Sequence, residues 1–196
     1  KQYVSFAEKN KFTNLVLSIK SSDVNKTIEL NKMLAQSFNY PIHIGLTEAG
    51  PHESAIIRST LALDPILKAG VGDTIRISIT GNPTDEVKIA KLILNECGIS
   101  QNLTKIISCP TCGRKAQNFF KLHKELVDYI NANPIKNAKV AIMGCYVNGI
   151  RESHNSDLGI FGNNTKFVII YKNKTIGAFQ LKDAIKTFIK YYIKLM

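Results

Sequence analysis

The chain is 196 residues long and 44% hydrophobic, and its 26 Lys and Arg against 15 Asp and Glu give a formal net charge of +11. This length allows one sizeable core or two small ones, and no apolar run approaches a membrane span. The positive charge favours an anionic partner, either a small molecule or an acidic protein. Only four of the cations are arginines and the lysines are spread along the chain, so we expect neither nucleic acid nor membrane as partner.

The first half alternates short apolar runs with helical patterns. Strands are expected at residues 14–20, 41–47 and 74–80, and helices at 23–38, 53–68 and 84–98. Three successive strand and helix pairs favour a parallel α/β layer. Lys20, Glu48 and Ser78 fall at or just after the carboxyl ends of these strands, where α/β folds gather their active sites.

Three such pairs cannot close a barrel of eight. The chain also begins at Lys1 without an initiator methionine or a signal-like segment. We therefore interpret it as part of a longer polypeptide, with residues 1–99 forming the last units of a TIM-type barrel and residues 100–196 a small α/β domain.

The second half places cysteines after strands. A strand at 105–108 leads into Cys109-Pro-Thr-Cys112, and a strand at 139–143 leads into Cys145. A helix at 115–131, a hairpin of strands at 166–172 and 175–179 around an Asn173-Lys174 turn, and a helix at 181–195 complete the pattern. On the first helix His123 is expected to be a satisfied core histidine. Lysines every four residues on the last helix form a solvated face or a docking face for an acidic electron donor.

Three cysteines in two loops that follow strands favour a soft metal centre, zinc or iron–sulfur, over magnesium or calcium. A Cys-x-x-Cys pair alone also occurs in redox dithiols and zinc ribbons. Cys145 stands without a second pair, and the next candidate ligands are Glu152 and His154. An incomplete thiolate set is more typical of a reactive centre than of a closed structural zinc site. The fourth cysteine, Cys97, is expected to be a small buried hydrophobic residue.

Five segments together resemble one known family. They are Leu17-Ser-Ile-Lys-Ser-Ser-Asp23, His43-Ile-Gly-Leu-Thr-Glu-Ala-Gly50, Gly72-Asp-Thr-Ile-Arg-Ile-Ser-Ile-Thr80, Ser108-Cys-Pro-Thr-Cys-Gly-Arg114 and Met143-Gly-Cys through Glu152. In this order they resemble the 4-hydroxy-3-methylbut-2-enyl diphosphate synthases of the non-mevalonate isoprenoid pathway. The resemblance spans essentially the whole chain but only the later half of a bacterial-type member.

The resemblance implies an iron-sulfur oxidoreductase that reductively opens 2-C-methyl-D-erythritol 2,4-cyclodiphosphate to 4-hydroxy-3-methylbut-2-enyl diphosphate. It implies a 4Fe-4S cluster in residues 100–196, reduced ferredoxin or flavodoxin as donor, and a homodimer in the full-length protein. The frequent lysine, asparagine and isoleucine of the chain indicate an AT-rich bacterial or plastid-bearing source, so the expected location is the bacterial cytoplasm or a plastid-type organelle. The residues implied are Cys109, Cys112, Cys145 and Glu152 as cluster ligands, Glu48 as catalytic acid or base, and Lys20, His43, Arg76, Ser78 and Asn148 as substrate-binding residues.

One departure from the family pattern lies beside the fourth ligand. The family usually reads Asn-Gly-Pro-Gly-Glu, whereas this chain has Ile150-Arg151 in place of Pro-Gly. If the glycine requires a positive φ, Arg151 strains the loop and misdirects Glu152, and His154 or water becomes the alternative ligand.

Two further hypotheses remain open from the residues. One is a zinc-stabilised basic module that binds an anionic partner, with its site closed by Cys109, Cys112, Cys145 and His154. The other is an inactive relic, because part of the substrate pocket belongs to the absent units.

Overall fold

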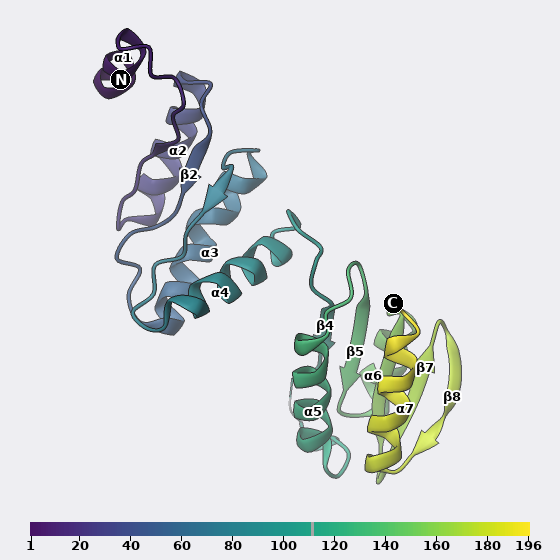
Figure 1. Ribbon diagram of the computed structural model, residues 1–196. Helices are drawn as coiled ribbons and strands as arrows, with labels where there is room; N and C mark the ends of the chain where they lie inside the picture. Colours follow the sequence, from purple (N-terminus) through teal and green to yellow (C-terminus); the bar gives the residue numbers. More distant parts are fainter. Residues whose placement is uncertain (111) are drawn as a thin grey trace. The chain divides into compact units, whose positions relative to one another are not determined.

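The computed structural model describes residues 1–110 and 112–196. It contains two compact units, Lys1–Ser100 (unit 1) and Gln101–Met196 (unit 2), each with its own core (Figure 1). No helix in the described part of the chain is long and apolar enough to cross a membrane.

Unit 1 begins with helix α1 (Gln2–Lys9) and continues as three strand and helix pairs. The strands are β1 (Leu17–Ser18), β2 (Ile42–Ile44) and β3 (Thr74–Ile75), and the helices are α2 (Val24–Ser37), α3 (His52–Lys68) and α4 (Pro83–Glu96). The strands form a parallel sheet in the order β1-β2-β3, as the alternating pattern predicts. The core of unit 1 lies between the sheet and the helices and contains the buried residues Ile44, Leu63 and Ile66.

Two helices of unit 1 start at side-chain caps. The Asp23 side chain accepts the N–H of Lys26 at 2.7 Å and starts α2. For α4 the cap is Asn82, whose side chain accepts from Thr84, with Pro83 in the first helical position. The strands are much shorter than the apolar runs that predicted them, because hydrogen-bonded pairing covers only two or three residues of each run.

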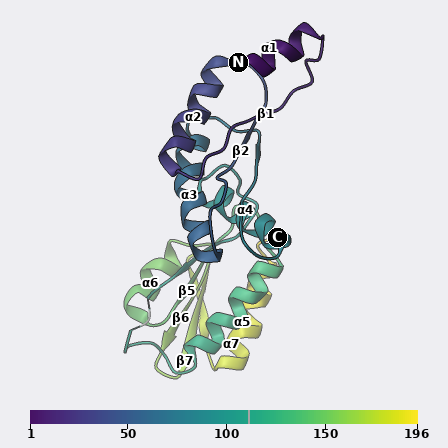
Figure 2. The same cartoon turned by 90° about the vertical axis from the view of Figure 1, so that its left-hand side faces the viewer.

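Unit 2 contains a five-stranded sheet. Its strands are β4 (Lys105–Ser108), β5 (Lys139–Met143), β6 (Leu158–Asn163), β7 (Lys166–Tyr171) and β8 (Lys174–Phe179), paired in that order. The first three are parallel, and β7 and β8 are antiparallel additions. Helices α5 (Phe119–Ala132) and α7 (Leu181–Ile193) cover one face and α6 (Tyr146–His154) the other (Figure 2).

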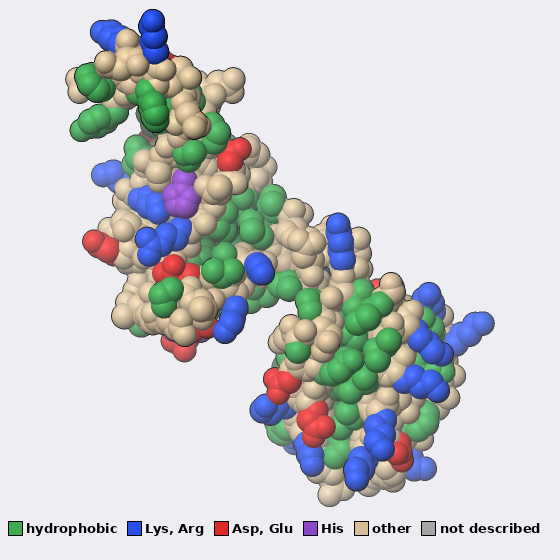
Figure 3. Space-filling view, viewed as in Figure 1, with side chains coloured by type: hydrophobic (Ala, Val, Ile, Leu, Met, Phe, Trp, Pro, Cys, Tyr) green, Lys and Arg blue, Asp and Glu red, His purple; other side chains and the backbone are tan. Residues whose placement is uncertain are grey.

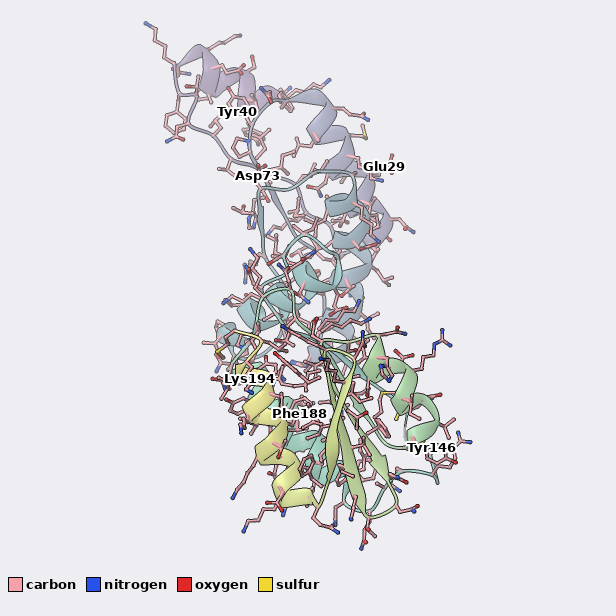
Figure 4. All side chains as sticks on the ribbon, turned by 90° about the vertical axis from the view of Figure 1, so that its right-hand side faces the viewer. Glu29, Tyr40, Asp73, Tyr146, Phe188 and Lys194 are labelled. Atoms are coloured by element: carbon pink, nitrogen blue, oxygen red, sulfur yellow. The ribbon has the colours of Figure 1, made fainter. Side chains whose placement is uncertain are left out.

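The core of unit 2 lies between its sheet and α5 and α7, where Phe188 of α7 is fully buried (Figure 4). Helix α5 starts at Phe119 and not near residue 115 as predicted, because Asn118 has a left-handed backbone conformation (φ +63°) that interrupts a right-handed helix. The β7–β8 turn falls at Lys172-Asn173, one residue earlier than predicted, and both residues have positive φ as in two-residue hairpin turns.

Candidate anion site and cysteine site

Three basic side chains of unit 1 lie along one row across the ends of its strands. The register pairs Ser18 with His43 and Ile44 with Ile75, so Lys20, Gly45 and Arg76 follow at the carboxyl ends. Gly45 has room for no side chain, since a Cβ there would lie 2.6 Å from the Arg76 carbonyl oxygen. The absence of a side chain at position 45 leaves room for the Arg76 backbone and for Lys20 Nζ, which would lie 3.6 Å from such a Cβ.

His43 connects this row through both ring nitrogens. Its Nε2 lies 3.3 Å from Lys20 Nζ and its Nδ1 lies 2.8 Å from Thr74 Oγ1. An ammonium group can only donate, so Nε2 accepts from Lys20 and Nδ1–H donates to Thr74. This arrangement requires a neutral imidazole.

The electrostatics of the row favour an anion. Burial, then the positive charges of Lys20 and Arg76, lower the pKa of His43 below its ordinary value. Burial and Arg76 likewise lower the pKa of Lys20, and Glu86 only partly opposes them. A bound anion would relieve the repulsion between these groups.

Glu86 fixes Arg76, a role that we did not predict from the sequence. Its carboxylate lies 3.5 Å from Arg76 Nε and accepts the N–H of Ile79 at 3.2 Å. The Glu86 side chain is 18% exposed and that of Arg76 is 60% exposed. The carboxylate therefore anchors the base of the guanidinium while much of the group faces solvent.

Two buried polar residues of α2 hold the loop that follows Lys20, and sequence reasoning did not identify them either. Asn31 Nδ2 donates to the Ile19 carbonyl at 3.3 Å, and Thr27 Oγ1 donates to the Ser21 carbonyl at 3.1 Å. Both side chains are fully buried. Their position among the apolar residues of a predicted helix was the sequence signal that could have identified them.

Glu48 stands in an uncommon backbone conformation beyond β2. Its φ is +52°, and its side chain is exposed. Arg58 of α3 donates to the carbonyls of Glu48, Ala49 and Ser22. A non-glycine residue with positive φ is frequent at functional sites. Ser78 is half-buried in the segment after β3.

The cysteines of unit 2 lie at one end of its sheet. The register pairs Ser108 with Ile142, so Cys109 and Gly144 emerge beside each other, and Cys109 Sγ accepts the Gly144 N–H at 3.1 Å. A Cβ on Gly144 would approach Cys109 Sγ at 3.4 Å and Lys115 Cβ at 3.2 Å. The cysteine loops therefore pack closely because position 144 is glycine.

The surroundings of Cys112 lower the pKa of its thiol. The N–H of Arg114, then its guanidinium and a contact with Cys145, lower the pKa of Cys112, while burial opposes them. Cys145 is buried at the N-cap position of α6 and makes no side-chain capping hydrogen bond there. The Cys112 thiol therefore lies between Arg114 and a buried second thiol.

The three thiols and Glu152 do not form a completed site in this structure. Across residues 1–110 and 112–196, no three His, Cys, Asp or Glu side chains are arranged to hold a metal ion. Glu152 is half-buried on α6, seven residues beyond Cys145 and so about 10 Å along a continuous helix. Sulfur donors suit a soft metal centre, but in the described residues neither the three cysteines nor Glu152 with two of them forms such a group.

Close packing fixes the rotation of α6. A Cβ on Gly149 would lie 2.3 Å from Phe161 Cβ, and a Cβ on Gly159 would lie 2.2 Å from Ser153 Cβ. Small residues thus bring helix and strand together at two successive turns. Ile150 and Arg151 lie between these contacts with helical backbone, so the expected strain at Arg151 does not occur.

Three further residues named from the sequence are His154, Cys97 and His123. His154 lies beside Lys139 and Asn173, with Nδ1 3.3 Å from Asn173 Oδ1; this is the end of β5 opposite the cysteines, so His154 is not placed to be their fourth ligand. Cys97 is half-buried against the unit 1 core, where burial and Asp64 raise its pKa to about 11. His123 is half-buried and lies 3.0 Å from Ser108 Oγ.

Family profiles match both units. The GcpE TIM-barrel domain matches residues 1–91 and the GcpE protein C-terminal domain matches residues 105–194. The chain belongs to the GcpE family. The resemblance inferred from five sequence segments is confirmed, as is the α/β fold class with an unclosed barrel.

Relatives in this family carry one name, 4-hydroxy-3-methylbut-2-en-1-yl diphosphate synthase (flavodoxin). The chain is 43% identical to the protein of Malacoplasma penetrans over 192 residues, which are 96% of the chain and 53% of the relative. It is 40% identical to those of Clostridium tetani, with 96% and 54% covered, and Thermotoga maritima, with 97% and 54% covered. The chain thus spans about half the length of these GcpE relatives.

Proposed function

We propose that this chain is the later part of a GcpE enzyme that converts 2-C-methyl-D-erythritol 2,4-cyclodiphosphate to 4-hydroxy-3-methylbut-2-enyl diphosphate. The observation that carries the proposal is the row of Lys20, His43 and Arg76 at the strand ends. The same chain has three cysteines in the loops that follow β4 and β5. The name shared by the relatives supports the same reaction.

The basic row binds the diphosphate in this proposal. Lys20 and the exposed face of Arg76 donate charge-assisted hydrogen bonds to phosphate oxygens, and the Ser78 hydroxyl adds a neutral donor. His43, neutral before binding, takes up a proton more readily once an anion lies against Lys20. Glu86 keeps Arg76 aimed while the ligand binds.

Glu48 supplies the proton that the leaving oxygen needs. Opening the ring and expelling one oxygen as water consumes two electrons and two protons, and a carboxylic acid at Glu48 can donate one of these protons. Asn148, exposed on α6, is proposed as a further substrate contact.

We propose Cys109, Cys112 and Cys145 as ligands of a 4Fe-4S cluster, with Glu152 as the fourth. When bound, this group supplies the two electrons one at a time, and two reduced flavodoxins or ferredoxins each give one. Glu152 reaches the cysteine end only if α6 unwinds or turns in its first turns. A homodimer of the full-length protein is part of the same proposal, and bacterial relatives favour the bacterial cytoplasm over a plastid.

Two measurements on the purified chain test the proposal. Anaerobic reconstitution with iron and sulfide should give a brown protein with an EPR signal after one-electron reduction, lost in Cys145→Ser. A colourless protein with one zinc per chain would instead support the zinc-stabilised basic module.

Calorimetry with the cyclic diphosphate tests the basic row. Lys20→Ala and Arg76→Ala should each weaken binding by roughly tenfold or more, since each removes a charge-assisted contact. Lys32→Ala, an exposed lysine on α2, is the matched control and should change binding less than twofold. Equal effects from all three variants would contradict the site. Turnover is a weaker test, because the chain spans about half the length of its relatives.

A further inference from the structure

The positive charge of the chain belongs to unit 2. Residues 101–196 contain fifteen Lys and Arg against five Asp and Glu, whereas residues 1–100 contain eleven and ten. On the face of unit 2 seen in Figure 3, blue side chains outnumber red ones. The unit that carries the cysteines therefore has the long-range field of a strongly basic protein.

Strand register identifies which side chains surround the cysteines. Gly162, near the end of β6, lies against Ala116 and the Gly144 carbonyl. Phe167 pairs with Gly162 and with Phe179 at the end of β8. The β6–β7 turn and the start of α7 therefore lie on the same edge of the sheet as the cysteine loops.

We define the cysteine-end rim as the basic residues and one aromatic on this edge. Lys115 is half-buried with Nζ 5.5 Å from the centre of the Phe120 ring, and Phe120 is 59% exposed. The other cations are exposed: Arg114, Lys121, Lys166 and Lys182. Asp183, in the first turn of α7, is an acidic side chain at the same edge.

We propose that the cysteine-end rim is the docking surface for an acidic electron-transfer protein of the flavodoxin class. The inference rests on the proposed function, because an electron donor would bind at this surface only if the cysteines hold a redox centre. Half-buried Cys112 lies within the rim, beside Arg114. Cations around a redox group steer an acidic partner to it, and an exposed aromatic supplies the apolar anchor typical of interface centres.

Charge reversal on the rim tests this surface against a matched control in the 196-residue chain. The rim variant is Lys121→Glu, Lys166→Glu and Lys182→Glu, at three exposed positions. The control is Lys105→Glu, Lys136→Glu and Lys174→Glu, which changes the net charge equally at the opposite end of the sheet. Near 0.15 M salt the Debye length is about 8 Å, so the control positions are largely screened from the rim.

The quantity measured is the Kd for an oxidised, FMN-loaded acidic flavodoxin, obtained by calorimetry. Circular dichroism of each variant checks that it is folded. The rim variant should weaken binding by roughly tenfold or more, with the control within about twofold. If the three Lys→Glu substitutions unfold unit 2, Lys→Gln substitutions at the same positions should weaken binding by a smaller factor. Equal Kd values for rim and control variants would overturn the proposal, as would a rim effect seen with a DNA duplex but not with flavodoxin.

A second measurement separates this proposal from the proposed function. After reconstitution, dithionite should reduce the rim variant as fully as the unmodified chain, while reduction by flavodoxin slows. If reconstitution yields no cluster but the rim still binds flavodoxin, the docking surface stands and the redox role fails. If a cluster forms and dithionite reduces it but rim reversal leaves flavodoxin reduction unchanged, the docking surface is wrong.

Discussion

Lys20 Nζ lies 3.3 Å from Nε2 of His43, so two basic groups share a hydrogen bond that exists only while the imidazole is neutral. Lowering the pH therefore breaks it. Burial and two nearby cations lower the pKa of His43 in the folded protein, so below the ordinary histidine value the unfolded chain binds more protons than the folded one. Stability of unit 1 should consequently fall as pH drops below about 6.5.

Urea unfolding at pH 7.5 and 5.5 checks this first prediction. The His43→Asn variant should lose less stability between the two pH values than the unmodified chain, because the titrating group is gone. An identical loss in both proteins would contradict it. Diphosphate should have the opposite effect on the same group, raising the pKa of His43 in an NMR titration because the anion offsets Lys20 and Arg76.

Glu86→Gln tests whether Arg76 must be held to bind an anion. The amide keeps the size of the side chain but removes the negative charge beside the guanidinium. We expect binding of the cyclic diphosphate to weaken by roughly threefold to tenfold, measured by calorimetry. Asp85→Asn, which removes a neighbouring surface carboxylate paired with Lys88, should leave binding unchanged, and a comparable loss there would show a nonspecific charge effect.

Gly149→Ala should destabilise unit 2 because the new Cβ would lie 2.3 Å from Phe161. Forced repacking of this kind costs about 1 to 3 kcal/mol, and denaturant unfolding followed by a unit 2 signal measures it. Gly113→Ala is the matched control, since a Cβ there meets nothing within 4 Å. A stable Gly149→Ala variant would mean that α6 does not pack on β6 as described.

Arg114→Gln should make Cys112 less reactive toward iodoacetamide at pH 7.5. The Arg114 guanidinium helps to lower the pKa of Cys112, so its loss raises the pKa and reduces the thiolate fraction. The larger contribution, from the Arg114 N–H, remains in the variant, so the loss should be partial. Alkylation rates against pH in a background with Cys97, Cys109 and Cys145 changed to Ser provide the measurement, and an unchanged profile would contradict it.

The pair Ile150→Pro and Arg151→Gly tests the helical state of α6. Proline inside a helix costs about 3 kcal/mol, so α6 should shorten and its far-ultraviolet helix signal should fall. If the helix is what keeps Glu152 away from the cysteines, the reconstituted cluster should survive longer in air. A shorter lifetime would indicate that the continuous helix serves the site.

Much of the fold follows from sequence pattern because periodicity and caps are local. Asp23 and its apolar stripe fix α2, and the strand at Lys105–Ser108 has the predicted bounds. Helix α6 was not predicted, because its apolar residues Tyr146, Val147 and Ile150 are exposed while Gly149 is buried. Strand β6 was also missed, since its two glycines interrupt a strand pattern.

The candidate site divides in the same way. Lys20, His43 and Arg76 could be named because they follow strands within recognisable segments. The partners that orient them, Thr74, Glu86 and Asn31, come from other elements, and their roles depend on register and helix rotation. Glu152 as ligand remains a prediction, because its position depends on whether α6 is continuous when a cluster is bound.

Arg58 links two loops of unit 1. One guanidinium, rooted in α3, binds carbonyls of Ser22 on one loop and of Glu48 and Ala49 on the next. The loop after Lys20 and the loop that carries Glu48 are thus held by the same Arg58 side chain. Under the proposed function, a displacement of the Lys20 loop on ligand binding would act through Arg58 on the loop that carries Glu48.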